Sequence, residues 1–119
     1  MRAKAMTAVL LGATLVTVPA TAATTHRAAK TTTVTVAMSE FKFKLSKASA
    51  PKGTVVYKVT NKGSVAHDFK INGKKTPLIN AGKSATLKVA FTKTGKFTYL
   101  CTVPGHAASG MKGTFTIKG

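Results

Sequence analysis

The chain has 119 residues, 44% of them hydrophobic and 18% charged, which is enough apolar material for one folded core and excludes a disordered composition. Its formal net charge is +17, and its two acidic residues are Glu40 and Asp68. The single cysteine excludes an internal disulfide, and nucleic-acid binding is disfavoured because the basic residues are not interleaved with aromatic side chains that stack on bases.

The first 22 residues have the pattern of a secretory signal peptide. Arg2 and Lys4 form a basic start, residues 6–18 are mostly apolar, and residues 20–22 are a small-residue cleavage site. The apolar run is too short for a membrane anchor, which must cross about 30 Å of hydrocarbon. We therefore expect export to the periplasm, the cell surface or the medium.

Residues 23–33 are rich in Thr and Ala and have no apolar period. This composition predicts a flexible tether ahead of a domain that covers residues 34–119. His26 lies in the tether, and we expect it to be an ordinary solvated residue.

From residue 34 onward, apolar and polar side chains alternate with a period of two, which is typical of half-buried strands. The predicted strands cover residues 34–38, 41–45, 55–59, 69–71, 87–91, 97–101 and 114–118. Turn signals separate them: Pro51-Lys52-Gly53, Asn61-Lys62-Gly63, Asn72-Gly73, Asn80-Ala81-Gly82 and Thr94-Gly95. No segment has a helical stripe. The pattern predicts an all-β, Greek-key antiparallel β-sandwich of about seven to eight strands.

Two details of the strand pattern predict further features of the fold and surface. The apolar phase switches across Ser39 and Glu40, which predicts a bulge or a bend there. Several lysines fall on outward-facing positions, where they form a solvated face: Lys42, Lys44, Lys58, Lys70, Lys88 and Lys96.

Four residues combine into a candidate metal site. Cys101, His106 and Met111 are spaced Cys-x4-His-x4-Met, and His67 lies upstream. One thiolate, two imidazoles and one thioether are the donor set of a trigonal copper site with a weak axial Met, which suits both Cu(I) and Cu(II). The strand phase supports this, because His67, Cys101 and Met111 share the inward phase of their strands while His106 comes from a loop.

Each of these residues alone has an ordinary structural explanation. A lone His is more often a surface residue, a buried Cys usually behaves as a small hydrophobe, and a Met is usually core filler. Their spacing, their shared strand phase and the unpaired Cys of an exported protein together favour one bound copper ion. Zinc is a competing occupant, because affinity alone does not exclude it.

The segment from Tyr99 to Gly113, YLCTVPGHAASGMKG, resembles the copper loop of the cupredoxins, the plastocyanin and azurin family, in its auracyanin-like branch. Residues 41–43, 53–63 and 67–69 resemble the N-terminal half of the family. The resemblance covers roughly residues 34–119. It implies a blue copper protein in which His67, Cys101 and His106 are the strong ligands and Met111 is the axial one.

One residue departs from the family pattern. Azurins and plastocyanins typically have Asn after the first His ligand, where it ties the two ligand loops together, and this chain has Asp68. An ionised Asp accepts hydrogen bonds but cannot donate one from its side chain. Its charge near the copper would favour Cu(II).

The predicted function is the shuttling of single electrons between redox partners, not catalysis. Copper oxidases and nitrite reductases of similar fold need a second copper site, which the remaining His26 cannot supply. The alternative is copper delivery or buffering without redox turnover. A third interpretation is a basic adhesion module that binds polyanions and whose metal is incidental.

We expect partners to dock at the exposed edge of His106. A small, mostly apolar patch surrounds it, made of Val103, Pro104, Gly105, Ala107 and Ala108. An uncharged patch suits the brief encounters of electron transfer. The positive charge favours acidic redox partners or peripheral association with an anionic cell surface, and we expect a monomer.

Overall fold

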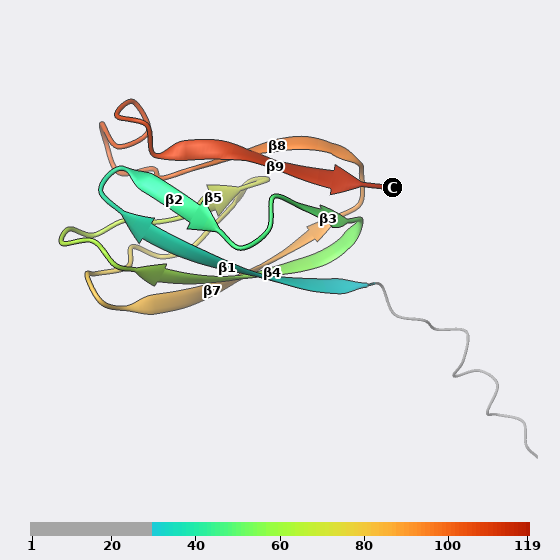
Figure 1. Cartoon of the computed structure of the whole chain (residues 1–119), viewed down its shortest axis with the longest axis horizontal. Helices are drawn as coiled ribbons and strands as arrows, with labels where there is room; N and C mark the ends of the chain where they lie inside the picture. The colour runs from blue at the N-terminus through green and yellow to red at the C-terminus, as the bar shows by residue number, and fades with distance from the viewer. Residues whose placement is uncertain (1–29) are drawn as a thin grey trace, which may run out of the picture.

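Residues 30–119 are described by a computed structural model, in which they form a sandwich of two β-sheets (Figure 1). This confirms the predicted all-β sandwich. The predicted signal peptide, residues 1–22, and the first part of the tether lie outside the described residues. Residues 30–119 contain no helix, and so none that is long and apolar enough to span a bilayer.

The two sheets contain nine strands. The first has the order β2-β1-β4-β7, with β1 at Thr31–Ser39, β2 at Lys42–Leu45, β4 at Gly53–Asn61 and β7 at Ser84–Phe91. The second has the order β3-β9-β8-β5-β6, with β3 at Ser49–Pro51, β5 at Lys70–Ile71, β6 at Lys74–Lys75, β8 at Gly95–Leu100 and β9 at Lys112–Lys118. The two unpredicted strands, β3 and β6, are too short for alternation to reveal them.

Two of the strand pairs are parallel, β1 with β4 and β3 with β9, so the predicted antiparallel sandwich also contains parallel pairing. Alternation reports which face a residue occupies and carries no information on the direction of the neighbouring strand.

The first strand begins earlier than predicted. Thr31 is already paired with Thr54, so residues 31–33 belong to β1 and not to a flexible tether. These residues lack apolar side chains, which hid the alternation. Threonine is nevertheless β-branched and suits a strand.

The phase switch predicted near Ser39 and Glu40 is a tight turn between β1 and β2, in which Ser39 lies opposite Lys42. Phe41 follows the apolar alternation of the strand predicted at residues 41–45. It lies in this turn instead and is 40% exposed. The chain reversal resets the phase, so that Phe43 and Leu45 pack against the core.

The core lies between the inner faces of the sheets, and its centre is aromatic. Phe69 is fully buried, and its ring centroid lies 5.0 Å from that of Tyr57, 5.3 Å from that of Phe43 and 5.5 Å from that of Tyr99. Phe115 meets Tyr57 at 5.5 Å. Because these rings come from both sheets, their contacts join the two layers.

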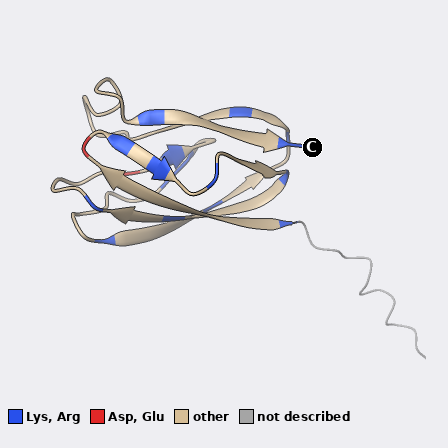
Figure 2. Cartoon of the chain, in the orientation of Figure 1, with Lys and Arg blue, Asp and Glu red and all other residues tan. Residues whose placement is uncertain are grey.

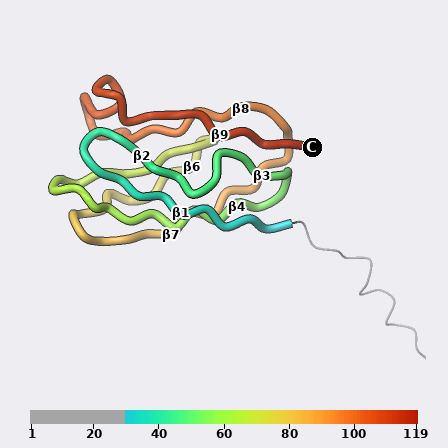
Figure 3. The backbone as a smooth tube through the Cα atoms, viewed as in Figure 1, coloured from blue at the N-terminus to red at the C-terminus, as the bar shows by residue number. Residues whose placement is uncertain are grey.

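The loops of residues 62–69 and 101–111 and the turn at Glu40 and Phe41 lie at one end of the sandwich, opposite the C-terminus (Figure 3). The predicted metal-binding residues come from these loops, so the fold brings distant parts of the chain together at this end.

Candidate metal centre

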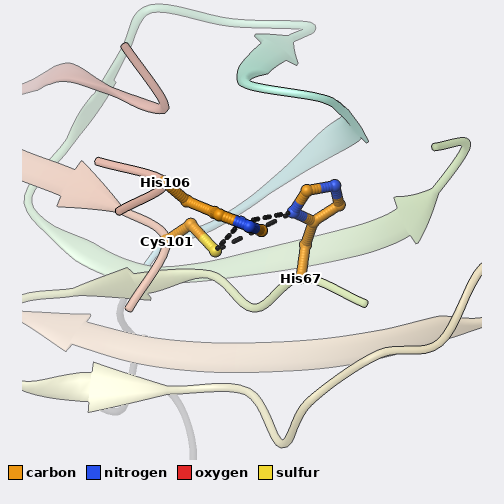
Figure 4. Close-up of side chains that lie close together, drawn as sticks. All are labelled: His67, Cys101 and His106. Carbon is orange, nitrogen blue, oxygen red and sulfur yellow. Dashed lines mark hydrogen bonds between the residues drawn. The ribbon is translucent and has the colours of Figure 1, made fainter. Parts of the chain in front are cut away.

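Three potential metal donors meet at the loop end of the sandwich. The donor atoms of His67, Cys101 and His106 all lie within 4.8 Å of one another. Nδ1 of His67 lies 3.1 Å from Nδ1 of His106, and Sγ of Cys101 lies 3.9 Å from the first and 3.6 Å from the second (Figure 4).

These separations fit one metal ion at the centre of the triangle. Metal–nitrogen bonds of about 2.0 Å and a metal–sulfur bond of about 2.3 Å place trigonal donors about 3.5–3.7 Å apart. The observed range of 3.1 to 3.9 Å brackets that spacing. A thiol and two imidazoles converging on one point have the donor chemistry that suits copper.

His67 is held by the backbone around it. Its N–H donates to the carbonyl of Ile79 at 3.1 Å, and the N–H of Ile79 donates back at 2.7 Å. The buried Asn61 amide donates to the carbonyls of Val65 and Ile79, each at 2.8 Å. The His67 side chain is fully buried, so its ring is held without exposure to water.

Cys101 follows directly after β8 and is 1% exposed. The backbone N–H of Asp68 points at its sulfur, at 3.5 Å. Burial raises the pKa of the Cys101 thiol. A metal binds the thiolate, so metal binding must displace the thiol proton, and affinity falls as the pH falls.

The loop between Cys101 and Met111 is closed by its own hydrogen bonds. The N–H of Cys101 donates to the carbonyl of Met111, and that of Met111 donates to the carbonyl of His106, each at 3.1 Å. Gly105 and Gly110 have φ of 84° and 110°, which the reversals in this loop require. Met111 is fully buried beside the cluster, and its role as axial ligand stays a prediction.

The family model for the cupredoxin-like domain matches residues 9–117. The chain belongs to the cupredoxin-like family. Membership confirms the predicted family and, at the level of the family, the predicted copper cofactor. A segment of 42 residues, 35% of this cupredoxin, is 43% identical to auracyanin-B of Chloroflexus aurantiacus. That segment spans only 18% of the relative's length.

Solved structures support the same fold. An auracyanin of Roseiflexus castenholzii superposes with a TM-score of 0.66 at 22% identity, over 74% of this cupredoxin and 98% of that chain. Rusticyanin of Thiobacillus ferrooxidans superposes with a TM-score of 0.60 at 24% identity, over 75% of this cupredoxin and 78% of the rusticyanin chain. A copper nitrite reductase of Nitrosomonas europaea gives 0.62 at 17% identity, and 42% of that longer chain is covered.

Asp68 ties together the two loops of this cupredoxin that carry the candidate metal donors, although it is not Asn. Its Oδ1 accepts from the N–H of Thr102 at 2.6 Å, and its Oδ2 accepts from the Thr102 hydroxyl. Lys75 Nζ lies 3.9 Å from Oδ2. This connection between the loops needs no side-chain donor at residue 68, because the N–H and the hydroxyl of Thr102 donate both hydrogen bonds.

Two contacts of the site were not predicted from the sequence. Phe41 packs edge-on against the ring of His106, with centroids 5.0 Å apart. Glu40 accepts from the backbone and hydroxyl of Ser64 and lies near Nε2 of His67, and the Ser64 hydrogen bonds lower the pKa of Glu40 to about 2. The scarcity of acids in so basic a chain was the one signal that could have drawn attention to Glu40.

Proposed function

We propose that this cupredoxin is an exported, monomeric one-electron carrier, not an enzyme. Its ligands would be Nδ1 of His67, Sγ of Cys101 and Nδ1 of His106, with Met111 as the weak axial ligand. The observation that carries the proposal is the convergence of the first three donors on one point. When bound, copper supplies a one-electron Cu(II)/Cu(I) couple.

The protein contributes rigidity to that couple. The backbone pair of His67 with Ile79 and the closed loop from Cys101 to Met111 hold the donors before any metal arrives. A preformed site limits the rearrangement that accompanies a change of charge, which keeps electron transfer fast. The same rigidity and burial favour a retained cofactor over copper delivery, the alternative function.

The surface at His106 supports the proposed docking site. His106 is half-buried, whereas Pro104, Gly105 and Ala108 around it are exposed. Phe41, 40% exposed, extends this surface from the neighbouring turn. Of the predicted patch, Val103 and Ala107 are half-buried and contribute less area.

A row of lysines beside the site supports an anionic partner. On the second sheet Lys112 lies opposite Leu100, Leu100 opposite Lys70, and Lys70 opposite Lys75. Figure 2 shows blue segments over both sheets and the two acidic residues at the loop end. Lys70 and Lys75 are directly opposed and repel each other, although Lys75 also lies 3.9 Å from Oδ2 of Asp68. An acidic redox protein or an anionic cell surface would relieve the remaining repulsion.

Adding Cu(II) to the metal-free mature protein tests the proposed function. We expect an intense visible band from thiolate-to-copper charge transfer, a reversible one-electron couple, and retention of the ion when a competing metal-free protein is added. A colourless complex would contradict the ligand set. Rapid loss of copper to the competitor would favour copper delivery.

Ala108→Glu tests the docking surface. Hexacyanoferrate(III), a small anionic one-electron oxidant, should oxidise the reduced variant more slowly by roughly tenfold, because the new carboxylate repels it at the point of approach. Stopped-flow absorbance measures the rate. Thr86→Glu, on the exposed face of β7, is the matched control with the same change in net charge. Equal slowing in both variants would rule out this docking surface.

A further inference from the structure

The two ring nitrogens of His67 have different surroundings. Nδ1 faces the cluster, at 3.1 Å from Nδ1 of His106. Nε2 is buried and has no hydrogen-bond partner among residues 30–119. Oε1 of Glu40 lies 3.6 Å from it, which is slightly longer than a hydrogen bond. A small movement of the carboxylate would satisfy this buried nitrogen.

The Glu40 carboxylate is itself held in place. It accepts from the backbone N–H of Ser64 at 2.8 Å and from the Ser64 hydroxyl at 2.6 Å. A side chain at Gly63 would collide with Oε1 of Glu40, so the turn leaves room for the carboxylate only because residue 63 is glycine. The N–H of Gly63 donates to Oδ1 of the buried Asn61 at 2.8 Å, which fixes the turn from the other side.

We propose that Glu40 is a positioning residue for the copper site, an inference that rests on the proposed function. Its carboxylate accepts the Nε2 proton of His67 and so keeps the Nδ1 lone pair free for the metal. In a neutral imidazole one nitrogen carries the proton and the other accepts, so fixing the proton on Nε2 decides which nitrogen can bind. Carboxylates that orient ligating histidines in this way raise ligand basicity and metal affinity.

The charge of Glu40 has a second consequence. The chain carries +17 overall, and a positive environment favours Cu(I), the less positive of the two copper states. Glu40 is one of only two acids, and its half-buried carboxylate lies 3.6 Å from Nε2 of the fully buried His67, so its charge acts on the site at short range. Its carboxylate therefore favours Cu(II) and lowers the reduction potential.

Glu40→Gln and Glu40→Ala separate the two effects. Glutamine keeps a carbonyl acceptor but removes the charge, so we expect the visible band to persist and the Cu(II)-to-Cu(I) affinity ratio to fall about tenfold, a rise of about 59 mV. Alanine removes the acceptor as well, and Cu(II) affinity should fall by a further factor of about 10. Thr86→Lys adds the same unit of net charge on the exposed face of β7 and is the matched control.

A measurement on the metal-free protein keeps this inference separate from the proposed function. Nitrogen-15 NMR should show His67 protonated at Nε2 in the wild-type protein and in Glu40→Gln, and a mixture of tautomers in Glu40→Ala. An unchanged tautomer in Glu40→Ala, or a potential shift in Glu40→Gln no larger than in Thr86→Lys, would overturn the inference. Failure of the wild-type protein to bind copper would contradict the proposed function, but the His67 tautomer could still be measured because that experiment uses the metal-free protein.

Discussion

Cys101→Ala should abolish the intense visible band of the copper-loaded protein and weaken Cu(II) binding by more than about 100-fold. The band arises from charge transfer between a thiolate and Cu(II), and Cys101 is the only cysteine in the chain. Loss of a direct ligand should exceed the 10–100-fold cost that is typical of losing an outer-shell partner. The two imidazoles would still bind Cu(II) weakly, with the pale colour of a nitrogen-ligated ion.

Absorption spectroscopy and a competitive copper titration measure both quantities. Cys101→Ala removes one buried sulfur, so circular dichroism of the metal-free variant should be unchanged. Thr102→Ala is a useful comparison, because it removes a hydroxyl that donates to Asp68 and leaves every proposed ligand in place. Its band should persist. If the Cys101→Ala protein kept the band or the affinity, the sulfur would not be a ligand.

The candidate site could be predicted from sequence because its donors are rare residue types at a fixed spacing. Cys101, His106 and Met111 lie within one loop, and the strand phase placed His67 on the inner face without any knowledge of the pairing. Donor chemistry then limited the possible metals. The structure added the measured convergence of His67, Cys101 and His106.

The surroundings of the site could not be predicted, because they depend on contacts that leave no periodic trace. Glu40 meets Ser64 across 24 positions of sequence, and Asp68 meets Thr102 across 34. Phe41 followed the apolar alternation, yet a turn of two residues moved it from the core to the ring of His106. A turn can reset the strand phase at any point, and the alternation alone does not show where.

Phe69→Ala should lower the free energy of unfolding of the metal-free protein by about 3–5 kcal/mol. Phe69 is fully buried between Tyr57, Phe43 and Tyr99, so its removal leaves a cavity between the two sheets. Small domains are typically stable by about 5–15 kcal/mol, so the loss is a large part of the total. Phe97→Ala is the control: Phe97 is only partly buried and packs on Phe91, and the loss should be smaller.

Copper should offset the Phe69→Ala defect, because the substitution removes a ring that packs on Tyr57, Phe43 and Tyr99 and leaves all four proposed ligands in the chain. A ligand that binds only the folded state at about 1,000 times its Kd stabilises that state by about 4.1 kcal/mol. The copper-loaded variant should therefore remain folded and coloured at urea concentrations that unfold its metal-free form. Urea titrations of both forms measure the difference. An equal loss of stability in Phe69→Ala and Phe97→Ala would contradict the central place of Phe69 in the core. If the copper-loaded Phe69→Ala protein were no more stable than its metal-free form, the copper site would not depend on the folded sandwich.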